Sequence, residues 1–181
     1  IDSKKMHVAY EKWPEIAKQS YEKVEEELQL KNIDHFIFAG MGGSGTIGDV
    51  MNSILSKEAF HVNIIKGYTL PNTVNSNTLI VITSVSGNTH ETLSILEQAY
   101  NSDATVIVFS SGGKMEKICR DREIIFRKIT MEHSPRASFV KFLFSILNIL
   151  KNIIPITSKD VLDAISSLEK TRDIISTNNL N

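Results

Sequence analysis

Short apolar runs, most of them followed by a glycine-rich turn and then by helical spacing, recur along the chain and restrict its fold. The runs are HFIFA (35–39), HVNIIK (61–66), TLIVIT (78–83), ATVIVFS (104–110) and EIIFRK (123–128). Helical spacing follows three of them, over residues 46–55, 89–100 and 114–120. Strands that alternate with helices in this way form parallel sheets with both faces covered. The sequence therefore predicts a three-layer α/β/α sandwich around a five-stranded, mainly parallel sheet.

Helical patterns also flank this central region. An amphipathic helix is predicted over residues 7–28, where Trp13 and Val24 share one apolar face, and a mostly polar helix is predicted over residues 158–176. With 181 residues, the chain is near the usual size of one globular domain. We therefore expect a single domain over residues 1–181, with its α/β core over residues 34–152.

The segment that follows Arg136 is apolar around almost its whole circumference, with only a narrow stripe of Ser, Lys and Asn. A helix of this kind must be buried nearly all round. It is either a central core helix of one chain, or a helix that packs partly against a second domain or a symmetry mate. We favour the second alternative, and so expect a homodimer or an association with a second domain.

Composition and charge exclude several classes of partner. Lys and Arg number 20 against 21 Asp and Glu, so the chain has no excess charge with which to bind nucleic acid or an anionic membrane surface. The longest apolar stretch, FVKFLFSILNILKNII, is interrupted by lysines and asparagines, which argues against a membrane span.

The single cysteine, Cys119, cannot form an intrachain disulfide, and this favours the cytoplasm. Neither Cys119 nor the five histidines show the spacing of metal ligands, so a small metabolite without a metal is expected.

The glycines mark the expected binding edge. Eight of the nine lie within residues 40–48, at 87, or at 112–113, and each group comes just after a predicted strand. Ligands of open parallel sheets bind at the carboxyl ends of the strands. These three loops should therefore share one edge of the sheet.

Two of the loops have the residues needed to hold a phosphate. In the second loop, two serines and a threonine place three hydroxyls around Gly87, and Asn88 is a suitable cap for the next helix. The same residue types also occur in ordinary strand-to-helix turns, but a second such loop one crossover away favours an anion site. The candidate phosphate ligands are Gly42, Gly43, Ser44, Ser84, Ser86 and Thr89.

The first loop also contains a literal G-x-G-x-x-G, at Gly40, Gly42 and Gly45. A dinucleotide site would require an acidic residue at the end of the second strand, about 20 residues further on, to bind the ribose hydroxyls. That strand ends in Lys66-Gly67 instead, and no Gly-Lys-Ser/Thr follows the glycines as in a Walker nucleotide loop. We therefore expect no nucleotide cofactor.

Four motifs in register give a more specific indication. GMGGSGTIGD, SVSGNTHETL, SSGGK and SPRAS occur in this order. Together they resemble the amino-terminal half of the bifunctional phosphoglucose/phosphomannose isomerases of the SIS (sugar isomerase) superfamily, over roughly residues 8–150. The resemblance implies a five-stranded parallel sheet with flavodoxin-like winding, whose serine and threonine loops bind the phosphate of a phosphosugar. The matching residues are Ser44, Ser84, Ser86 and Thr89.

The same resemblance implies an isomerase that interconverts glucose 6-phosphate or mannose 6-phosphate with fructose 6-phosphate through a cis-enediol. Arg136 matches the arginine of the family's Pro-Arg pair and is implied to stabilise the enediolate, since a fixed guanidinium suits two adjacent oxygens that share negative charge. The family's general base and ring-opening histidine come from a carboxyl-terminal SIS domain, which lies beyond this chain. Glu91, Glu132 and His133 are weak local substitutes.

Two alternatives remain open. One is a complete single-domain SIS phosphohexuloisomerase that assembles its site from several subunits. The other is a non-catalytic phosphosugar-binding SIS protein, in which the phosphate grip remains and no base exists. The GMGGSG and Pro-Arg motifs favour the bifunctional isomerase over the first of these.

Overall fold

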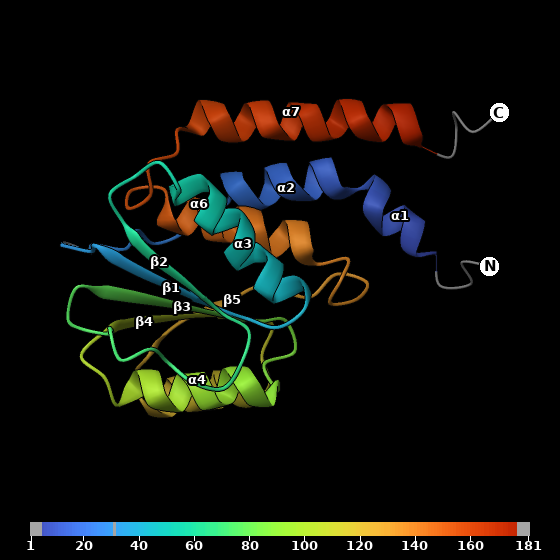
Figure 1. The fold of residues 1–181 in the computed structure, drawn as a ribbon. Coiled ribbons are helices and arrows are strands. Elements are labelled where there is room, and N and C mark those ends of the chain that lie inside the picture. Colours follow the sequence, from blue (N-terminus) through green and yellow to red (C-terminus); the bar gives the residue numbers. More distant parts are fainter. Residues whose placement is uncertain (1–4, 31, 177–181) are drawn as a thin grey trace. The chain divides into compact units, whose positions relative to one another are not determined.

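The computed structural model describes residues 5–30 and 32–176, which form two compact units (Figure 1). The unit Gln29–Met131 contains the β-sheet with its connecting helices. The other unit joins the segments Ile1–Leu28 and Glu132–Asn181 and is helical in its described part. The prediction of a single domain over the whole chain stays a prediction.

The sheet has five strands, and all of its pairings are parallel. The strands are β1 (His35–Ala39), β2 (His61–Ile65), β3 (Thr78–Ser84), β4 (Thr105–Ser110) and β5 (Ile125–Lys128). Their order in the sheet is β2-β1-β3-β4-β5. Each strand therefore lies within, or at most one residue beyond, the apolar run from which it was predicted, and the flavodoxin-like winding is confirmed.

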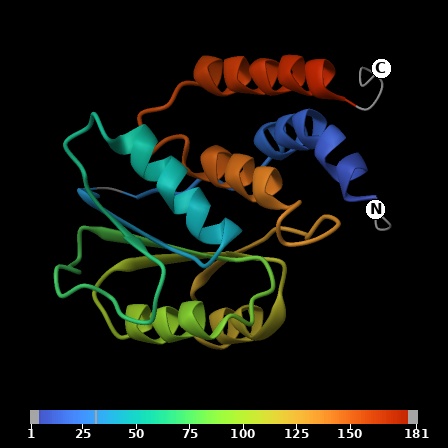
Figure 2. The same ribbon diagram turned by 45° about the vertical axis from the view of Figure 1, so that its right-hand side comes forward.

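Helices cover both faces of this sheet (Figures 1 and 2). On one face lies α3 (Gly43–Leu55), whose Gly48 is so close to β1 that an added Cβ would stand 3.0 Å from Cβ of Phe38. On the other face, Ile37 packs in one apolar cluster with residues of α4 (His90–Tyr100) and α5 (Gly113–Asp121). Because side chains alternate along a strand, successive residues of β1 serve opposite layers. The three-layer α/β/α sandwich is confirmed within this unit.

Helix α3 begins three residues before the predicted start at Thr46. Its first turn consists of Gly43, Ser44 and Gly45, and hydrogen bonds from Ser44 N to Met41 O (3.1 Å) and from Thr46 N to Gly42 O (3.1 Å) close it. Glycine and serine have low helix propensity and no apolar periodicity, so this turn gives no helical signal in the sequence.

The helical unit begins with two short helices, α1 (Met6–Glu11) and α2 (Trp13–Glu22), where one helix over 7–28 was predicted. The break falls at Lys12 because Pro14, near the start of α2, disfavours helical continuation through the residues before it. Glu22 ends α2, since the following run of three glutamates would repel itself at a negative helix terminus. Val24, which was placed on the apolar face, is 96% exposed. The predicted boundaries of this helix were wrong.

Helix α6 (Phe139–Leu150) is the most apolar element of the unit, and α2 lies alongside it (Figures 1 and 2). The indole Nε1 of Trp13 donates a hydrogen bond to Ala137 O (2.9 Å), and Nδ2 of Asn148 donates to Lys23 O (2.8 Å). Phe139 is half-buried, and the other apolar residues of α6 are buried in the single chain. These contacts bury one side of α6 against α2, and packing of α6 on a second domain or a symmetry mate stays a prediction.

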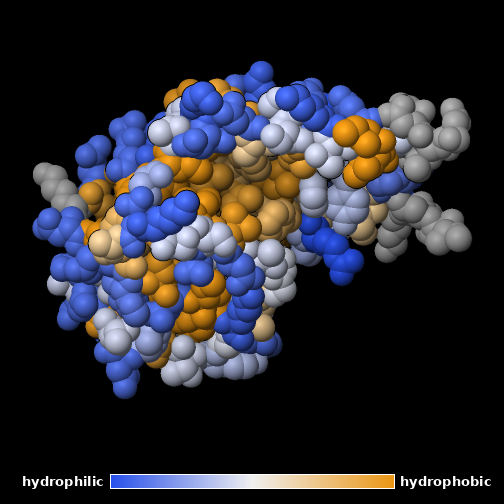
Figure 3. Space-filling view, turned by 45° about the horizontal axis from the view of Figure 1, so that its top comes forward, coloured by the Kyte–Doolittle hydropathy of each residue, from blue (hydrophilic) through white to orange (hydrophobic). Residues whose placement is uncertain are grey.

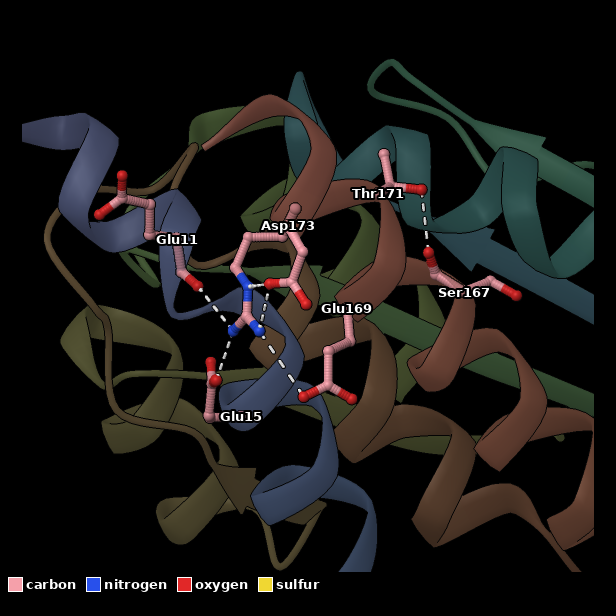
Figure 4. Close-up of polar contacts among 7 residues, drawn as sticks. Glu11, Glu15, Ser167, Glu169, Thr171 and Asp173 are labelled. Carbon is pink, nitrogen blue, oxygen red and sulfur yellow. Dashed lines mark hydrogen bonds and ion pairs between the residues drawn. The ribbon is translucent and has the colours of Figure 1, made fainter. Parts of the chain in front are cut away.

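Helix α7 (Ser158–Ile175) confirms the predicted polar helix. A full capping box starts it, in which Thr157 Oγ1 accepts from Asp160 N (3.2 Å) and Asp160 Oδ2 accepts from Thr157 N (3.0 Å). Towards its end, Arg172 forms ion pairs with Glu15 of α2 (2.5 Å) and Asp173 (2.8 Å), drawn in Figure 4.

Figure 3 shows apolar surface at the carboxyl-terminal end of α7, where Ile174 and Ile175 are 75% and 65% exposed. Within residues 5–30 and 32–176, no helix combines the length and apolarity needed to cross a bilayer.

Candidate functional site

The predicted site lies at the point where the winding of the sheet reverses. Strands β1 and β3 are neighbours, but the chain leaves β1 towards β2 and leaves β3 towards β4, on the other side. The loop 40–42 follows β1 and the loop 85–89 follows β3, so both lie at the same carboxyl edge. Open parallel sheets bind their ligands in the crevice that such a reversal creates.

Two glycines of the first loop are required by close packing of the chain on itself. A Cβ at Gly40 would stand 2.7 Å from Ser44 C and O, and a Cβ at Gly45 would stand 2.7 Å from Gly40 O. Real Cβ atoms do not approach backbone so closely. Gly40 and Gly45 therefore let the end of β1 cross the first turn of α3, independently of any ligand.

Two further glycines, Gly42 and Gly43, are not explained by close packing. Gly42 has φ 53° and ψ −126°, a conformation that side chains disfavour. Gly43 is exposed, has no positive φ, and no atom lies within 4 Å of an added Cβ. Glycine in the middle of a helix costs roughly 0.5–1 kcal/mol relative to alanine; Gly43 is the first residue of α3, where this cost is smaller, and packing does not explain it. Bare backbone at Gly43 is what close approach of a ligand would require.

In the second loop, the hydroxyl oxygens of Ser86 and Thr89 accept hydrogen bonds, so their own protons remain available to a ligand. Ser84 is buried; its Oγ accepts from Gly87 N (3.2 Å) and donates to Thr89 Oγ1 (3.3 Å). Ser86 Oγ accepts from Asn88 N (3.3 Å). Because Thr89 and Ser86 both serve as acceptors inside the loop, each keeps its own proton for an external acceptor. Ser84 orients Thr89, while Ser86 is exposed and Thr89 half-buried.

The third loop, which follows β4 and contains Gly112 and Gly113, packs directly against the second loop. Sequence reasoning missed this role. A Cβ at Gly87 (φ 67°) would stand 1.8 Å from Gly112 O, and a Cβ at Gly113 (φ 71°) would stand 2.4 Å from Ser86 O. Met115 N donates to Gly87 O (3.0 Å). We call these three glycines the glycine contact. The glycine pair at 112–113 was the only sequence signal, and nothing in the sequence identified its partner as Gly87.

The prediction that Asn88 caps α4 is wrong. The N-cap of α4 is Thr89, whose side chain makes no cap hydrogen bond. Asn88 Oδ1 instead accepts from Lys114 N (3.0 Å) in the first turn of α5, while its Nδ2 donates to Ser86 O (3.1 Å). The positive φ of Gly87 turns the chain before Asn88, so its amide faces the neighbouring helix.

Both helices that start at the reversal lack a side-chain cap. The N-cap residues are Gly42 for α3 and Thr89 for α4, and neither side chain bonds to its helix, whereas α7 has a complete capping box. No side chain or backbone group in the described part of the chain hydrogen-bonds the half-buried Ser44 hydroxyl. Free N–H groups and the positive ends of two helices thus lie at one edge of the sheet, which is suited to an anion without a metal. Among the residues that the structure describes, no group of three His, Cys, Asp or Glu could hold a metal ion.

A carboxylate stands at the same edge. Glu91 lies in the first turn of α4, and its negative charge, with smaller effects of burial and hydrogen bonding, raises the pKa of the Tyr68 hydroxyl. Ser94 and Gln98 of α4 donate to Tyr68 O at 3.0 and 2.6 Å, which ties the loop after β2 to this helix. Cys119 in α5 is buried, and burial raises its thiol pKa to about 11, so it is no nucleophile at neutral pH.

The remaining candidates lie in the helical unit. Arg136 is exposed just before α6, and no described residue pairs with its guanidinium. Its loop is held by Ser138 Oγ, which accepts from Glu132 N (2.9 Å) and donates to Ser134 O (2.8 Å). The carboxylate of Glu132 forms an ion pair with Lys141 (2.5 Å), which weakens its case as a general base. The roles of Arg136, Glu132 and His133 stay predictions.

Comparison with known proteins agrees with this geometry. Residues 29–154 match the SIS domain family. The bifunctional phosphoglucose/phosphomannose isomerase of Aquifex aeolicus is 34% identical over 116 residues, which are 63% of this chain and 36% of that protein. The enzyme of the same name from Caldicellulosiruptor bescii is 31% identical over 129 residues, 69% of this chain and 38% of its own length.

The fold is likewise similar to that of tagatose-6-phosphate ketose/aldose isomerase from Escherichia coli. The TM-score is 0.66 at 15% identity, and the match covers 93% of this chain and 53% of that one. The matched segment spans under two fifths of the length of the two bifunctional isomerases. Five parallel strands in the observed order, the glycine and hydroxyl loops at their reversal, and the family match over most of the chain lead to one conclusion: this chain belongs to the SIS domain family.

Proposed function

We propose that this chain is the phosphosugar-binding part of an aldose–ketose isomerase that interconverts glucose 6-phosphate or mannose 6-phosphate with fructose 6-phosphate. The observation that carries the proposal is the pair of uncapped helix N-termini at the reversal of the sheet, flanked by outward hydroxyl protons. The substrates are those after which the two bifunctional relatives are named.

In this proposal the phosphate lies between the first and second loops. Its oxygens accept protons from the hydroxyls of Ser44, Ser86 and Thr89 and from the free N–H groups at the starts of α3 and α4. Gly42 and Gly43 leave room for the oxygens to approach the backbone. Ser84 acts through Thr89, by fixing the direction in which the Thr89 hydroxyl donates.

Arg136 is proposed to act at the other end of the sugar. Transfer of a proton between C1 and C2 of the open-chain sugar places negative charge on two adjacent oxygens, and a guanidinium can donate to both at once. By analogy with oxyanion-hole donors, removal of such a group costs about 2.7–4 kcal/mol of transition-state stabilisation.

The general base is proposed to come from outside this chain. Glu132 is held in an ion pair by Lys141, and Glu91 lies in the first turn of α4 beside the Tyr68 hydroxyl. A second SIS domain, in the same polypeptide or in a partner, would supply the base and the ring-opening acid, in keeping with the greater length of the relatives. This chain alone should therefore bind phosphosugar and turn it over poorly.

The test is a calorimetric titration of the chain with 5-phosphoarabinonate, an enediolate mimic, beside NAD and inorganic phosphate. We expect the mimic to bind more tightly than phosphate, Ser86→Ala to abolish this binding, and Arg136→Ala to weaken binding of the mimic but not of phosphate. Ser167→Ala, at an exposed serine of α7, is the matched control and should change nothing. Binding of NAD in preference, or no advantage of the mimic over phosphate, would overturn the proposal.

A further inference from the structure

One lysine at the carboxyl edge of the sheet has no counter-charge. Lys66, which follows β2, forms an ion pair with Asp49 (2.7 Å), and Lys128 at the end of β5 forms one with Glu116 (2.9 Å). Lys114 is exposed, and no carboxylate of the described residues pairs with its ammonium.

The position of Lys114 is electrostatically unfavourable for the helix that holds it. It is the second residue of α5, where the helix dipole favours an acidic side chain and disfavours a cation. The comparable first turns of α4 and α7 have Glu91 and Asp160. Glu116 lies in the same turn as Lys114, but residues two apart do not face each other on a helix, and Glu116 is paired with Lys128. A residue that breaks a local rule without compensation inside the chain is a candidate for function.

The backbone of Lys114 is fixed beside the second loop. Its N–H donates to Asn88 Oδ1 (3.0 Å), and Asn88 is joined to Ser86 through Nδ2 (3.1 Å to Ser86 O) and through its backbone N–H (3.3 Å to Ser86 Oγ). The glycine contact of residues 87, 112 and 113 lets these two loops approach closely, and the hydrogen bond from Met115 N to Gly87 O (3.0 Å) joins them. In this series of hydrogen bonds, only Asn88 separates Lys114 from Ser86. The flexible four-carbon side chain of Lys114 therefore starts close to the outward hydroxyl of Ser86.

We propose that Lys114 is a further phosphate-binding residue of this site, whose ammonium pairs with the phosphate held at the start of α4. The inference rests on the proposed function, because the phosphosugar supplies the missing negative charge. A phosphate monoester carries close to two negative charges at neutral pH, and three hydroxyls and two helix ends offset only part of them. Lys114 would thus make the site select a dianion over a monoanion such as a sulfate ester.

The test uses the 181-residue chain and two probes, 5-phosphoarabinonate and inorganic phosphate, titrated calorimetrically at low salt and at high salt. Lys114→Met keeps the stem and removes the charge, and we expect it to raise the Kd of both probes about five-fold at low salt. The difference should shrink at high salt, where charges are screened. Lys114→Arg should retain binding. The matched control is Lys117→Met, an exposed lysine one turn further along α5, which should leave the Kd unchanged.

The outcomes separate this inference from the proposed function. Equal Kd values for Lys114→Met and the unmodified chain at low salt, or an equal loss in Lys117→Met, would overturn the role of Lys114. If phosphate binding depends on Lys114 but 5-phosphoarabinonate binds no better than phosphate, the proposed function falls and the phosphate role of Lys114 stands. If the unmodified chain binds neither probe, both fall. Because Lys114→Met removes a cation from a helix N-terminus, its melting temperature should not decrease, so weaker binding cannot be ascribed to unfolding.

Discussion

Gly43 and Gly87 each follow a strand of the same sheet, yet they are glycines for opposite reasons. Gly87 lies against the carbonyl of Gly112, and any side chain would collide with it. Gly43 faces open space, and an alanine there would meet no protein atom. A glycine enclosed by its own chain is required because a side chain would not fit there. A glycine that is exposed in a helix is not required by packing, so its presence indicates that another molecule approaches it. Only the second kind is an argument for a ligand.

The strongest test of this contrast is Gly87→Ala. The added Cβ would stand 1.8 Å from Gly112 O and the residue would keep a positive φ, so we expect a loss of about 4 kcal/mol or more in the free energy of unfolding. Urea denaturation followed by circular dichroism measures it. A loss below about 1 kcal/mol would mean that the second and third loops are not held together as described.

Asn88→Ala removes the hydrogen bonds that join Ser86 to the start of α5 but leaves the glycine contact intact. We expect a loss of about 1–2 kcal/mol in unfolding free energy, as for other helix caps, and weaker phosphate binding because Ser86 loses its orientation. Asn101→Ala, at the far end of α4, is the comparison. An equal loss of binding in both variants would contradict the assigned role of Asn88.

Gly43→Ala sharpens the comparison, because stability and binding should move in opposite directions. Alanine at this open first position of α3 should raise the unfolding free energy by at most about 0.5 kcal/mol, while the new methyl group should weaken 5-phosphoarabinonate binding about ten-fold. Gly48→Ala in the same helix is the matched variant: its Cβ would press on Phe38 and Ile64, so it should lower stability and leave binding unchanged. Unaltered binding in Gly43→Ala would remove the ligand explanation for this glycine.

The smallest effect on phosphate binding is expected at the capped helix α7. Thr157→Ala should lower the unfolding free energy by about 1 kcal/mol, with no change in phosphate binding. Hydrogen bonds from the Thr157 hydroxyl and backbone lower the pKa of Asp160, so its stabilising contribution is complete above its ordinary pKa of 3.8 and is lost as pH falls below that value. The acid-induced loss of stability should therefore be smaller in Thr157→Ala, as thermal melts from neutral pH to well below pH 3.8 would reveal.

Local patterns predicted the strands well, because each buried strand is one uninterrupted apolar run such as TLIVIT. The first turn of α3 was missed because Gly43, Ser44 and Gly45 have no apolar periodicity. Pro14 signals the break at Lys12, whereas amphipathic spacing alone predicts one continuous helix.

The site itself was predictable in part. The hydroxyl and glycine residues of both loops were found in the sequence, since they lie next to one another along the chain. Two features depend on residues about 25 positions apart: the contact of Gly87 with Gly112, and the hydrogen bond from Lys114 to Asn88. Neither leaves a trace in local spacing. Asn88 was assigned to the wrong helix for this reason, and Lys114 was not singled out at all.

The glycine contact also couples the site to the assembly of the sheet. The second loop acquires its shape only when β4 has paired with β3 and brought Gly112 against Gly87. A chain in which β4 has not yet docked has the serines and threonine of the second loop but no formed anion site. A phosphate that binds only the finished loop therefore stabilises the β3–β4 pairing by mass action, although it touches neither strand. Slower hydrogen exchange of the β3 and β4 amides in the presence of ligand would be the signature of this coupling.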